Sequence, residues 1–467
     1  WTVNEIHIWP LLKWIIFCEI RKKTNTNDET KKQTNQPFVK KITRKIKSKV
    51  RSLFSFFSAC MSFYATKIKK VDYIFAGAPT HRVKWNDKQI NRYFDPMMDY
   101  LLEQGSQSYL LEYQKIDPSS TFDSSRVIDL TNLLPLFSFK QSIYKSSKLH
   151  NLRGYQELIA EIVQAFGIKA PILEKTLKRR INTMTYWANL FEYILKKTKA
   201  KYAFGLCYYS NAMHGLNLAA NRLKIVSIDM QHGSQGSLHP CYYFIKAPAT
   251  GYNILPKACW VWDENSFENI SRWTKATNHF PLLGGNPWID YLQNLNVVVY
   301  SGEKPMILYT VQLSDPIISK NILKIISSTS DKYSWWLRLH PRTSPEQHLE
   351  LIGRLKKNHL FHLVNLNEAT SQPLPLILKD CALHISESSG AISEAALVGI
   401  KSIIINEIGV NYFSYCIKNG MAVACLSRSY RDIMAVIEET IQKTEDKQIQ
   451  NSKGADFREI LNGSFKT

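Results

Sequence analysis

The chain has 467 residues, of which 45% are hydrophobic and 12% aromatic, so it is not a disordered protein and has material for two or three domains. The formal net charge is +21, but residues 1–70 hold 16 Lys/Arg against 4 Asp/Glu, which places the excess in an N-terminal extension and argues against a nucleic-acid partner. The eight cysteines form no Cys-x-x-Cys pair or Cys/His cluster, so neither a zinc site nor a disulfide framework is predicted, and a cytoplasmic location is expected.

The N-terminal extension, residues 1–70, combines apolar and basic stretches. Residues 8–20 are apolar but are interrupted by Lys13 and Glu19, and they are too short to span a bilayer, which needs about 20 apolar residues. A lysine-rich run at 21–51 and an aromatic patch at 53–64 follow. Two interpretations stay open: a solvated tail with a helix docked on the body, or a peripheral anchor on the anionic inner face of the cytoplasmic membrane.

The first half of the chain, residues 71–294, alternates short apolar runs with segments of helical spacing. Residues 255–267 predict a buried strand followed by a helix that starts at Asp263 or Glu264. Predicted strands that alternate with predicted helices indicate a parallel sheet whose strands are connected by crossover helices. The other predicted strands are 71–78, 108–113, 201–209 and 224–233, and the other predicted helices are 91–104, 155–199 and 211–222.

A second run of the same kind, residues 305–445, begins after a break at 294–304 and ends before a tail at 446–467. The sequence therefore predicts an α/β protein with two Rossmann-like domains whose strand ends face a central cleft. The predicted strands of the second run are 306–312, 333–341, 362–366, 381–386 and 401–406, and its predicted helices are 317–328, 344–357, 390–398 and 432–444.

A cationic loop follows the predicted strand at 333–341. Arg338, His340 and Arg342 could bind a phosphate or pyrophosphate through charge-assisted hydrogen bonds at the carboxyl end of the strand. The alternative is a turn in which Pro341 ends the strand and the arginines are solvated.

A hydroxyl-rich loop follows the predicted strand at 381–386 and leads into a helix. Ser388 and Ser389 offer hydroxyl donors, Gly390 allows close approach of the backbone, and the first turn of a helix attracts phosphate. The alternative is an ordinary helix cap with Glu394 near the start of the helix. Together with the cationic loop this pattern favours a phosphate site, because the two loops are expected to end neighbouring strands.

Polar residues also follow the strand at 224–233. Gln231, His232 and Gly233 form a glycine-flanked loop in which His232 is a candidate general base, because an imidazole titrates near neutral pH. A tight turn with a structurally satisfied His232 is the alternative.

The loop after the first strand supplies further candidates on the acceptor side. His81 and Arg82 could contact the acceptor, and Asp95 or Asp99 could act as the base. Asp95 also precedes Pro96, so the more favoured interpretation of Asp95 is a helix N-cap.

The His340-Pro341 and Ser388-Ser389 pairs resemble the HP and SS motifs of bacterial sialyltransferases and of Kdo transferases of capsule and lipopolysaccharide assembly. With Gln231-His232-Gly233 they also resemble the teichoic-acid glycerophosphotransferases, which use CDP-glycerol. The resemblance implies a GT-B fold in which His340, Ser388 and Ser389 hold the donor phosphate, Arg338 supports them and His232 lies on the acceptor side. The Asp/Glu-Asp/Glu-Gly triplet of the sialyltransferases is missing.

These features predict a metal-independent, inverting transfer of a sugar from a nucleotide donor to a surface polysaccharide or lipopolysaccharide acceptor. A CMP-activated sialic acid or Kdo-like sugar is the favoured donor, with no other cofactor and no bound metal, since no Asp-x-Asp pair ends a strand. His232 is the first candidate base. The alternatives are a CDP-glycerol-type polyol-phosphate transferase, a UDP-sugar-dependent GT-B enzyme, a two-Rossmann epimerase, and a membrane-recruited scaffold without catalysis.

Overall fold

A computed structural model describes residues 1–25, 60–61, 68–139, 149, 152–233, 235–236, 238–295, 297–427, 429–445 and 456–463. Nearly all of the aromatic patch at 53–64, most of the basic run at 21–51 and the greater part of the tail lie outside these residues.

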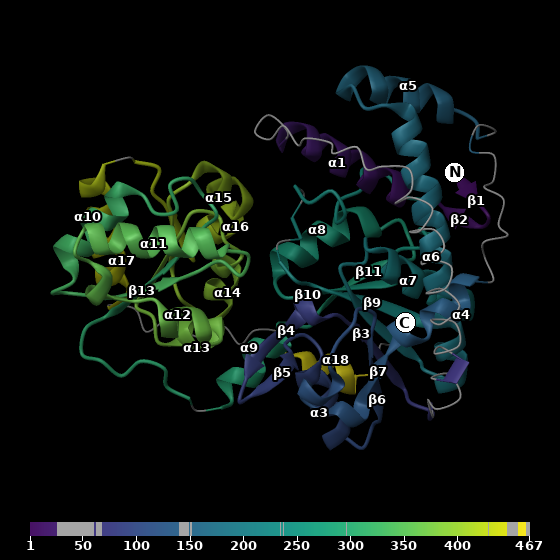
Figure 1. The fold of residues 1–467 in the computed structure, drawn as a ribbon, viewed down its shortest axis with the longest axis horizontal. Helices are drawn as coiled ribbons and strands as arrows, with labels where there is room; N and C mark the ends of the chain where they lie inside the picture. Colours follow the sequence, from purple (N-terminus) through teal and green to yellow (C-terminus); the bar gives the residue numbers. More distant parts are fainter. Residues whose placement is uncertain are drawn as a thin grey trace, which may run out of the picture. The chain divides into compact units, whose positions relative to one another are not determined.

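The chain divides into two compact units, each built around its own sheet (Figure 1). The first unit comprises Trp1–Lys84, Lys88–Val261 and Phe267–Leu283, and the second comprises Trp85–Asp87, Trp262–Ser266 and Gly284–Thr467. The domain limits expected from the sequence stay predictions.

The first unit contains a seven-stranded parallel sheet. Its strands are β3 (Tyr73–Gly77), β6 (Ser108–Glu112), β7 (Val127–Asp129), β8 (Tyr202–Leu206), β9 (Val226–Met230), β10 (Ala258–Val261) and β11 (Phe280–Leu283). They lie in the order β11-β10-β9-β8-β3-β6-β7. The first strand of this sheet, β3, thus lies in its interior. Strands β6 and β7 extend the sheet on one side of β3, and β8 to β11 then extend it on the other side. The strand order reverses between β3 and β8, and in such sheets ligands bind outside the carboxyl ends of the strands at this switch point.

Helices cover this sheet, which explains why its central strands are apolar throughout rather than alternating. Ile74 and Ala76 of β3 pack with residues of α6 and α7, while Phe75 stacks with Phe204 at a ring-centroid distance of 4.9 Å. The helices of the unit are α1 (Trp9–Asn25), α3 (Asp95–Glu103), α4 (Leu134–Phe139), α5 (Tyr155–Phe166), α6 (Ala170–Thr198), α7 (Asn211–Leu223) and α8 (Glu264–Thr274), the last assigned partly to each unit.

Two segments differ from the sequence-based prediction for physical reasons. The helix predicted over 155–199 is two helices, because Gly167 ends α5 with a φ of +59° and α6 restarts with a proline in its first turn. The helix predicted over 91–104 starts only at α3, after a hairpin of β4 (Arg82–Trp85) and β5 (Lys88–Asn91). Its turn residues Asn86 and Asp87 have φ values of 47° and 59°, as a type I′ turn requires.

The start of the chain packs on the first unit. Strands β1 (Thr2–Val3) and β2 (Ile6–His7) form a hairpin, and α1 buries Leu11, Leu12 and Ile15 in a core shared with α5 and α6. A docked helix, one of the two interpretations of this extension, is therefore present. None of the helices in the described ranges is long and apolar enough to cross a bilayer.

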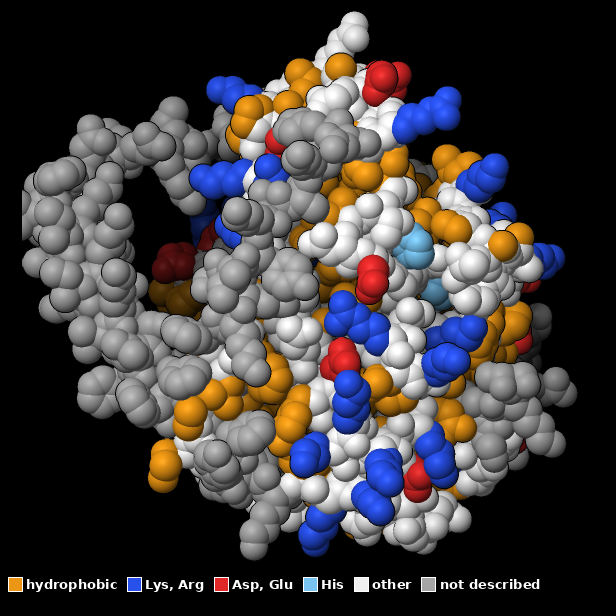
Figure 2. All heavy atoms as spheres, turned by 90° about the vertical axis from the view of Figure 1, so that its right-hand side faces the viewer, with side chains coloured by type: hydrophobic (Ala, Val, Ile, Leu, Met, Phe, Trp, Pro, Cys, Tyr) orange, Lys and Arg blue, Asp and Glu red, His pale blue; other side chains and the backbone are white. Residues whose placement is uncertain are grey.

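Basic side chains gather on the face of the molecule shown in Figure 2, among hydrophobic ones and few acidic ones. Helix α6 has several exposed basic residues in its sequence and just beyond its end, including Lys175, Arg179, Lys196 and Lys199. Positive charge is therefore not confined to the extension.

The second unit contains a six-stranded parallel sheet with the same winding. Its strands are β12 (Met306–Thr310), β13 (Ser334–Arg338), β14 (Val364–Asn365), β15 (Leu383–Ser386), β16 (Ser402–Ile404) and β17 (Ala422–Ala424). They lie in the order β14-β13-β12-β15-β16-β17, so the order reverses between β12 and β15. Its helices are α9 (Pro287–Gln293), α10 (Lys320–Thr329), α11 (Pro345–Lys357), α12 (Asn367–Ser371), α13 (Leu374–Lys379), α14 (Ala391–Leu397), α15 (Glu407–Tyr412), α16 (Ser414–Lys418), α17 (Tyr430–Glu445) and α18 (Phe457–Asn462).

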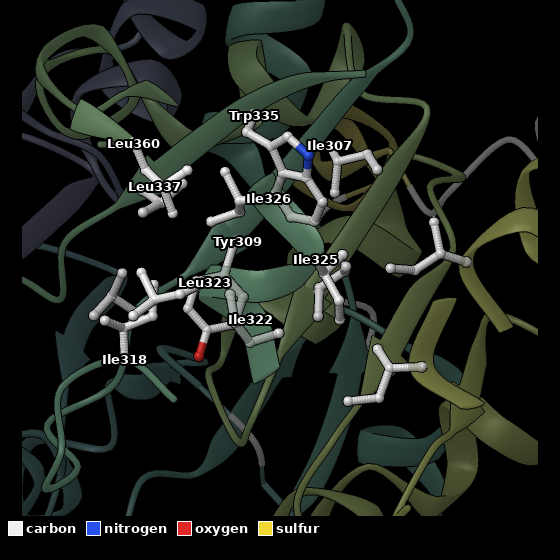
Figure 3. Close-up of a cluster of buried hydrophobic side chains, with 14 of the residues drawn as sticks. Ile307, Tyr309, Ile318, Ile322, Leu323, Ile325, Ile326, Trp335, Leu337 and Leu360 are labelled. Carbon is white, nitrogen blue, oxygen red and sulfur yellow. The ribbon is translucent and has the colours of Figure 1, made fainter. Parts of the chain in front are cut away.

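Alternate residues of these strands enter cores on opposite faces. Ile307 and Tyr309 point with Trp335 toward α10 and its neighbours (Figure 3), whereas Leu308 and Trp336 belong to the core on the other face. Both units are thus doubly wound parallel sheets, which confirms the predicted α/β class with two Rossmann-like domains.

One expectation about this sheet is wrong. The cationic loop follows β13 and the hydroxyl-rich loop follows β15, and β12 lies between these two strands. The two loops therefore do not end neighbouring strands. The reason is the winding order, which inserts the first strand of the unit between its second and fourth.

Candidate functional site

The carboxyl end of the first sheet collects imidazoles and a phenol beside its switch point. His81 follows β3, Tyr209 follows β8 and His232 follows β9. Because β3, β8 and β9 are consecutive neighbours in the sheet, three loops from distant parts of the sequence meet at one edge. This is where a doubly wound sheet offers a ligand site.

His232 is held by aromatic neighbours. Its Nε2 lies 3.1 Å from the Tyr209 hydroxyl, and its ring centroid lies 6.3 Å from that of Tyr242. Burial lowers the pKa of His232 to about 4, and the nearby charges of His239 and Arg92 lower the pKa further in the same direction. The imidazole is therefore neutral at pH 7, and the lowered pKa makes it a weaker base than an exposed histidine.

His81 lies close enough to His232 for the charges of the two imidazoles to interact. Its Nδ1 accepts a hydrogen bond from the Ala78 amide at 3.2 Å, and its ring lies edge-on to Tyr93 and Tyr113. Burial first, and then the charge of His232, lower the pKa of His81 to about 3. The structure thus brings together two of the residues selected from the sequence, both in their neutral form.

A buried carboxyl group supports this edge from below. Asp229, in β9, accepts hydrogen bonds from the Tyr208 amide at 3.0 Å and from the Tyr242 hydroxyl at 2.7 Å. Burial raises the pKa of Asp229 to about 7. Sequence reasoning missed these residues, although an aspartate inside an otherwise apolar predicted strand was a signal for a buried polar contact.

Arg82 and Asp95 belong to a buried ionic cluster at the ends of β3 and β6. Arg82 donates through Nε and Nη2 to Glu112 Oε1 at 3.1 and 2.5 Å, and its Nη1 lies 3.8 Å from Asp95 Oδ2. Burial raises the pKa of Asp95 to about 7, against the opposing effect of Arg82. The guanidinium is already engaged by carboxylates, so its predicted contact with an acceptor would compete with Glu112.

The helix-cap interpretation of Asp95 is wrong. The N-cap of α3 is Phe94, and Asp95 is the first helical residue, whose carboxylate accepts a hydrogen bond from the Asn91 amide at 2.7 Å. Asn91 Oδ1 accepts from the amides of Tyr93 and Phe94 and so stabilises the turn that precedes the helix.

Asp99, the other candidate base, takes part in a different interaction. It accepts a hydrogen bond from Arg126 Nη2 at 2.6 Å, and Arg126 also contacts Asp123. Burial raises the pKa of Asp99, and Arg126 opposes this effect. Its carboxylate is thus part of an ion-paired group.

The amides of the His232 loop are buried beside the imidazole. Gln231 donates from Nε2 to the Gly233 carbonyl at 3.0 Å, which closes a tight turn. The Gln235 side chain is 1% exposed, and neither of its amide atoms has a hydrogen-bond partner among the described residues. A buried unpaired amide is costly, so Gln235 is a further candidate for ligand contact.

In the second unit, the hydroxyl-rich loop lies at the switch point between β12 and β15. Ser389 accepts a hydrogen bond from the Ala391 amide at 3.2 Å, while its own amide donates to Ser386 Oγ. Ser388 is half-buried, Gly390 is exposed, and Glu394 lies in the first turn of α14. The N-cap of α14 is Gly390, and the Ser389 hydroxyl is already engaged by the first amide of the helix.

The side chains of the cationic loop differ in their hydrogen bonds and in their exposure. Arg338 donates from Nη1 to the carbonyls of Ala369 and Gln372 at 2.6 and 2.7 Å, which ties β13 to α12. His340 is half-buried and its Nδ1 accepts from the Arg342 amide at 3.1 Å, while Pro341 and Arg342 are exposed. Burial and the charge of Arg342 lower the pKa of His340, so it too is neutral at pH 7.

A row of buried polar side chains next to the start of the hydroxyl-rich loop was not anticipated. His384 in β15 lies 3.0 Å from Thr310 Oγ1 and 2.8 Å from Ser402 Oγ, and Thr310 donates to Ser386 at 2.8 Å. Burial lowers the pKa of His384 to about 3. The row crosses three adjacent strands and fixes Ser386, where the hydroxyl-rich loop begins.

Within the described part of the chain, no group of three or more His, Cys, Asp or Glu side chains is placed to hold a metal ion.

No protein-family model and no curated protein matches this sequence. Among solved structures, a protein assigned as a UDP-N-acetylglucosamine 2-epimerase from Listeria monocytogenes is similar, with 12% identity over 84% of this chain and 94% of that chain and a TM-score of 0.53. Another UDP-N-acetylglucosamine 2-epimerase has 12% identity over 84% and 93% of the two chains and a TM-score of 0.50. The glycosyltransferase SnogD from Streptomyces nogalater has 12% identity over 80% and 96% and a TM-score of 0.44, which is too low to carry an argument. The strand order of both sheets and the first two similarities agree on one conclusion: the chain has the two-Rossmann-domain GT-B fold.

Proposed function

We propose that this protein is a glycosyltransferase that moves a sugar from a nucleotide donor to a surface polysaccharide or lipopolysaccharide acceptor. The observation that carries the proposal is the position of His232. This neutral imidazole lies at the switch-point edge of the first sheet, in contact with the Tyr209 hydroxyl. A hydroxyl-rich loop at the switch point of the second sheet supports it, because this is where a doubly wound sheet receives a nucleotide.

In the proposed reaction His232 acts as the general base. It takes the proton of the acceptor hydroxyl while the acceptor oxygen forms a bond to the anomeric carbon, and the bond from that carbon to the donor phosphate oxygen breaks with inversion. The leaving phosphate keeps the electron pair, and His340, Ser388 and Ser389 bind it, with Arg338 holding the loop through the backbone of α12. His81, with Gln231 and Gly233, lies on the acceptor side.

The nucleotide of the donor is a separate part of the proposal. The His-Pro and Ser-Ser pairs favour a CMP-linked sialic acid or Kdo-like sugar, whereas the names of the fold relatives favour a UDP-linked sugar. CDP-glycerol is the third candidate. A thermal-shift panel of CMP, CDP, UDP and GDP distinguishes them, since a ligand at about 100 times its dissociation constant adds roughly 2.7 kcal/mol of stability.

The phosphate site is tested in the same panel. We expect His340→Ala and Ser388→Ala to remove the stabilisation by the preferred nucleotide, and Leu349→Ser, an exposed substitution on α11, to leave it unchanged. If both site variants keep full stabilisation, the donor site has been assigned to the wrong loops. If no nucleotide stabilises the wild-type protein, the non-catalytic scaffold becomes the better hypothesis.

The base is tested by transfer activity. His232→Gln is expected to reduce kcat by about 10²–10⁴-fold, the usual contribution of general acid–base catalysis, with little change in nucleotide binding.

The metal-independent route is tested with EDTA. Transfer activity is expected to persist in EDTA, and its loss there would refute this route.

The protein is further proposed to act at the cytoplasmic face of a membrane, to which residues 1–70 bind as a peripheral element. The concentration of positive charge in this segment supports the proposal. Vesicle flotation with and without residues 26–59 tests the basic run, and equal partitioning of the two forms would reject a contribution from this run.

A second candidate function is epimerisation of a nucleotide-linked sugar, favoured by the names of the two fold relatives with TM-scores of 0.50 or more. Incubation with UDP-N-acetylglucosamine alone separates the candidates. An NMR signal from a C2 epimer without added acceptor would support the epimerase, whereas transfer that requires an acceptor supports the glycosyltransferase.

A further inference from the structure

The loop at 238–246, which follows the His232 loop in the first unit, exposes large apolar side chains. Leu238 is 56% exposed, Tyr243 37% and Ile245 92%, while the intervening Tyr242 and Phe244 are buried. Single exposed apolar residues are common on protein surfaces, whereas three on one short loop make this loop a candidate interaction surface.

The buried side of this loop is fixed to the candidate site. The Tyr208 hydroxyl donates to the Cys241 carbonyl, the Tyr242 hydroxyl donates to Asp229 at 2.7 Å, and the His239 ring lies 5.6 Å from that of Tyr209. Tyr209 in turn contacts His232. The exposed apolar side chains are therefore adjacent in sequence to the residues that pack around the proposed base.

Helix α1 joins the same surface. Lys13 donates through Nζ to the Tyr243 carbonyl and lies 4.0 Å from the centroid of the Phe244 ring, and the Trp14 ring lies 4.7 Å from that of Tyr209. The helix thus packs along the loop with one aromatic and one cationic side chain.

Positive charge continues from this contact along α1. Arg21, Lys22 and Lys23 are exposed, and Arg21 lies eight residues, or about 12 Å of helix, beyond Lys13. Lys22 pairs with Glu19 and Lys23 donates to the carbonyls of Phe166 and Gly167, so lipid phosphates would compete with these surface contacts. Lys246 is exposed at the end of the loop, and the sequence continues from α1 directly into its lysine-rich run. Exposed apolar side chains and Lys246 thus lie next to one another on the loop, and α1, which contacts the loop through Lys13, carries further cations.

We propose that the loop at 238–246 and helix α1 together form a docking face for an anionic bilayer. Leu238, Tyr243 and Ile245 insert at the boundary between headgroups and acyl chains, and the cations of α1 and Lys246 meet the lipid phosphates. This deepens the proposed function, on which it rests in one respect: the bilayer would present a membrane-borne acceptor next to His232. Charge complementarity to the cations, together with exposed apolar side chains that can enter the acyl layer, favours an anionic lipid surface as the occupant.

The test is flotation of the full chain with vesicles of phosphatidylcholine alone or mixed with phosphatidylglycerol. We expect binding to the mixed vesicles, weaker binding to the neutral ones, and a loss of about tenfold or more in the partition coefficient for the Leu238→Ser/Ile245→Ser double variant. The matched control is Leu349→Ser/Ile408→Ser, because these residues of the second unit are 69% and 61% exposed. Circular dichroism of both variants verifies that they are folded.

The proposal is overturned if the double variant floats like the wild type, if the control variant loses as much binding, or if neutral and anionic vesicles bind equally. Binding that depends only on residues 26–59 would also overturn it, since the loop would then contribute nothing. No donor or acceptor is present in this assay, so its outcome is independent of the nucleotide panel, and failure of one does not imply failure of the other.

Discussion

The ion pair of Arg82 and Glu112 shows how strongly burial affects the energetics of charged side chains. The Arg82 side chain is 2% exposed and that of Glu112 is fully buried, so the charge of Glu112 is compensated by Arg82, which also lies near Asp95. Burial raises the pKa of Glu112, while Arg82 acts in the opposite direction. Such a pair adds little net stability but is expensive to break on one side.

Replacing one partner of this pair should therefore be severe. Arg82→Met is expected to lower the free energy of unfolding by about 3–5 kcal/mol, because Glu112 is left as an uncompensated buried charge. Urea unfolding measures the effect. The double variant Arg82→Met/Glu112→Leu is expected to recover much of the loss, and a double variant that is worse than the single one would contradict the explanation.

The buried His384 predicts a pH dependence of stability. Its pKa is about 3 in the folded protein, below the usual 6.5 of the unfolded chain, so between these values only the unfolded state binds the proton. The contribution of the neutral His384 to the free energy of unfolding is fully present above pH 6.5 and is lost as the pH falls toward 3. The His384→Gln variant should lower the slope of unfolding free energy against pH by about 1.4 kcal/mol per unit between pH 4.5 and 5.5. An unchanged slope in urea titrations across this range would contradict the assignment.

Among the elements, α6 and α7 pack so closely that a side chain is excluded between them. A Cβ atom on Gly215 would lie 2.5 Å from Trp187 Cβ and 2.8 Å from the Ala188 backbone nitrogen. Gly353, exposed in the interior of α11, has nothing within 4 Å of the same position.

These two glycines make a matched pair. Gly215→Ala should destabilise the protein by about 1–3 kcal/mol, because α6 and α7 are forced apart. Gly353→Ala should stabilise it by about 0.5–1 kcal/mol, because alanine is the better helix former. Thermal unfolding of both variants measures the difference, and a loss of stability in both would show that helix packing is not the cause.

The elements also show what the sequence could and could not reveal. The apolar runs that became β3, β8 and β12 were recognisable because strands buried on both faces are continuously apolar. The break between α5 and α6 was visible in Gly167 and Pro171, but the helical spacing on both sides masked it. The β4–β5 hairpin was hidden because its turn, Asn86-Asp87, lacks the glycine that usually marks a type I′ turn.

The candidate site was predicted only as far as local motifs reach. His81 and His232 were selected because polar residues followed apolar strands, and the sheet places both at one edge. Their aromatic support, Tyr209 and Tyr242, depends on contacts between distant segments that no local pattern specifies. The same holds for the engagement of Arg338 with α12, which only the folded chain reveals.

The molecule as a whole has separate hydrophobic cores in its two units. The cores around β3 and around β12 contain no residue in common. Chains of this kind commonly depart from two-state unfolding.

Scanning calorimetry should accordingly resolve two transitions. Gly215→Ala is expected to lower the midpoint of one transition and Gly353→Ala to raise the midpoint of the other, since the two residues belong to different units. A single transition that responds to both substitutions would show that the units unfold together.

The packing of α1 on α6 has a consequence for synthesis of the chain. The apolar stripe of α1, with Leu11, Leu12 and Ile15, leaves the ribosome about 180 residues before its partner helix is complete. At 5–20 residues per second this interval lasts on the order of ten seconds or more. During that time a nascent amphipathic helix followed by a basic stretch is presented without its docking surface, so chaperones or lipids can reach it before the tertiary fold does.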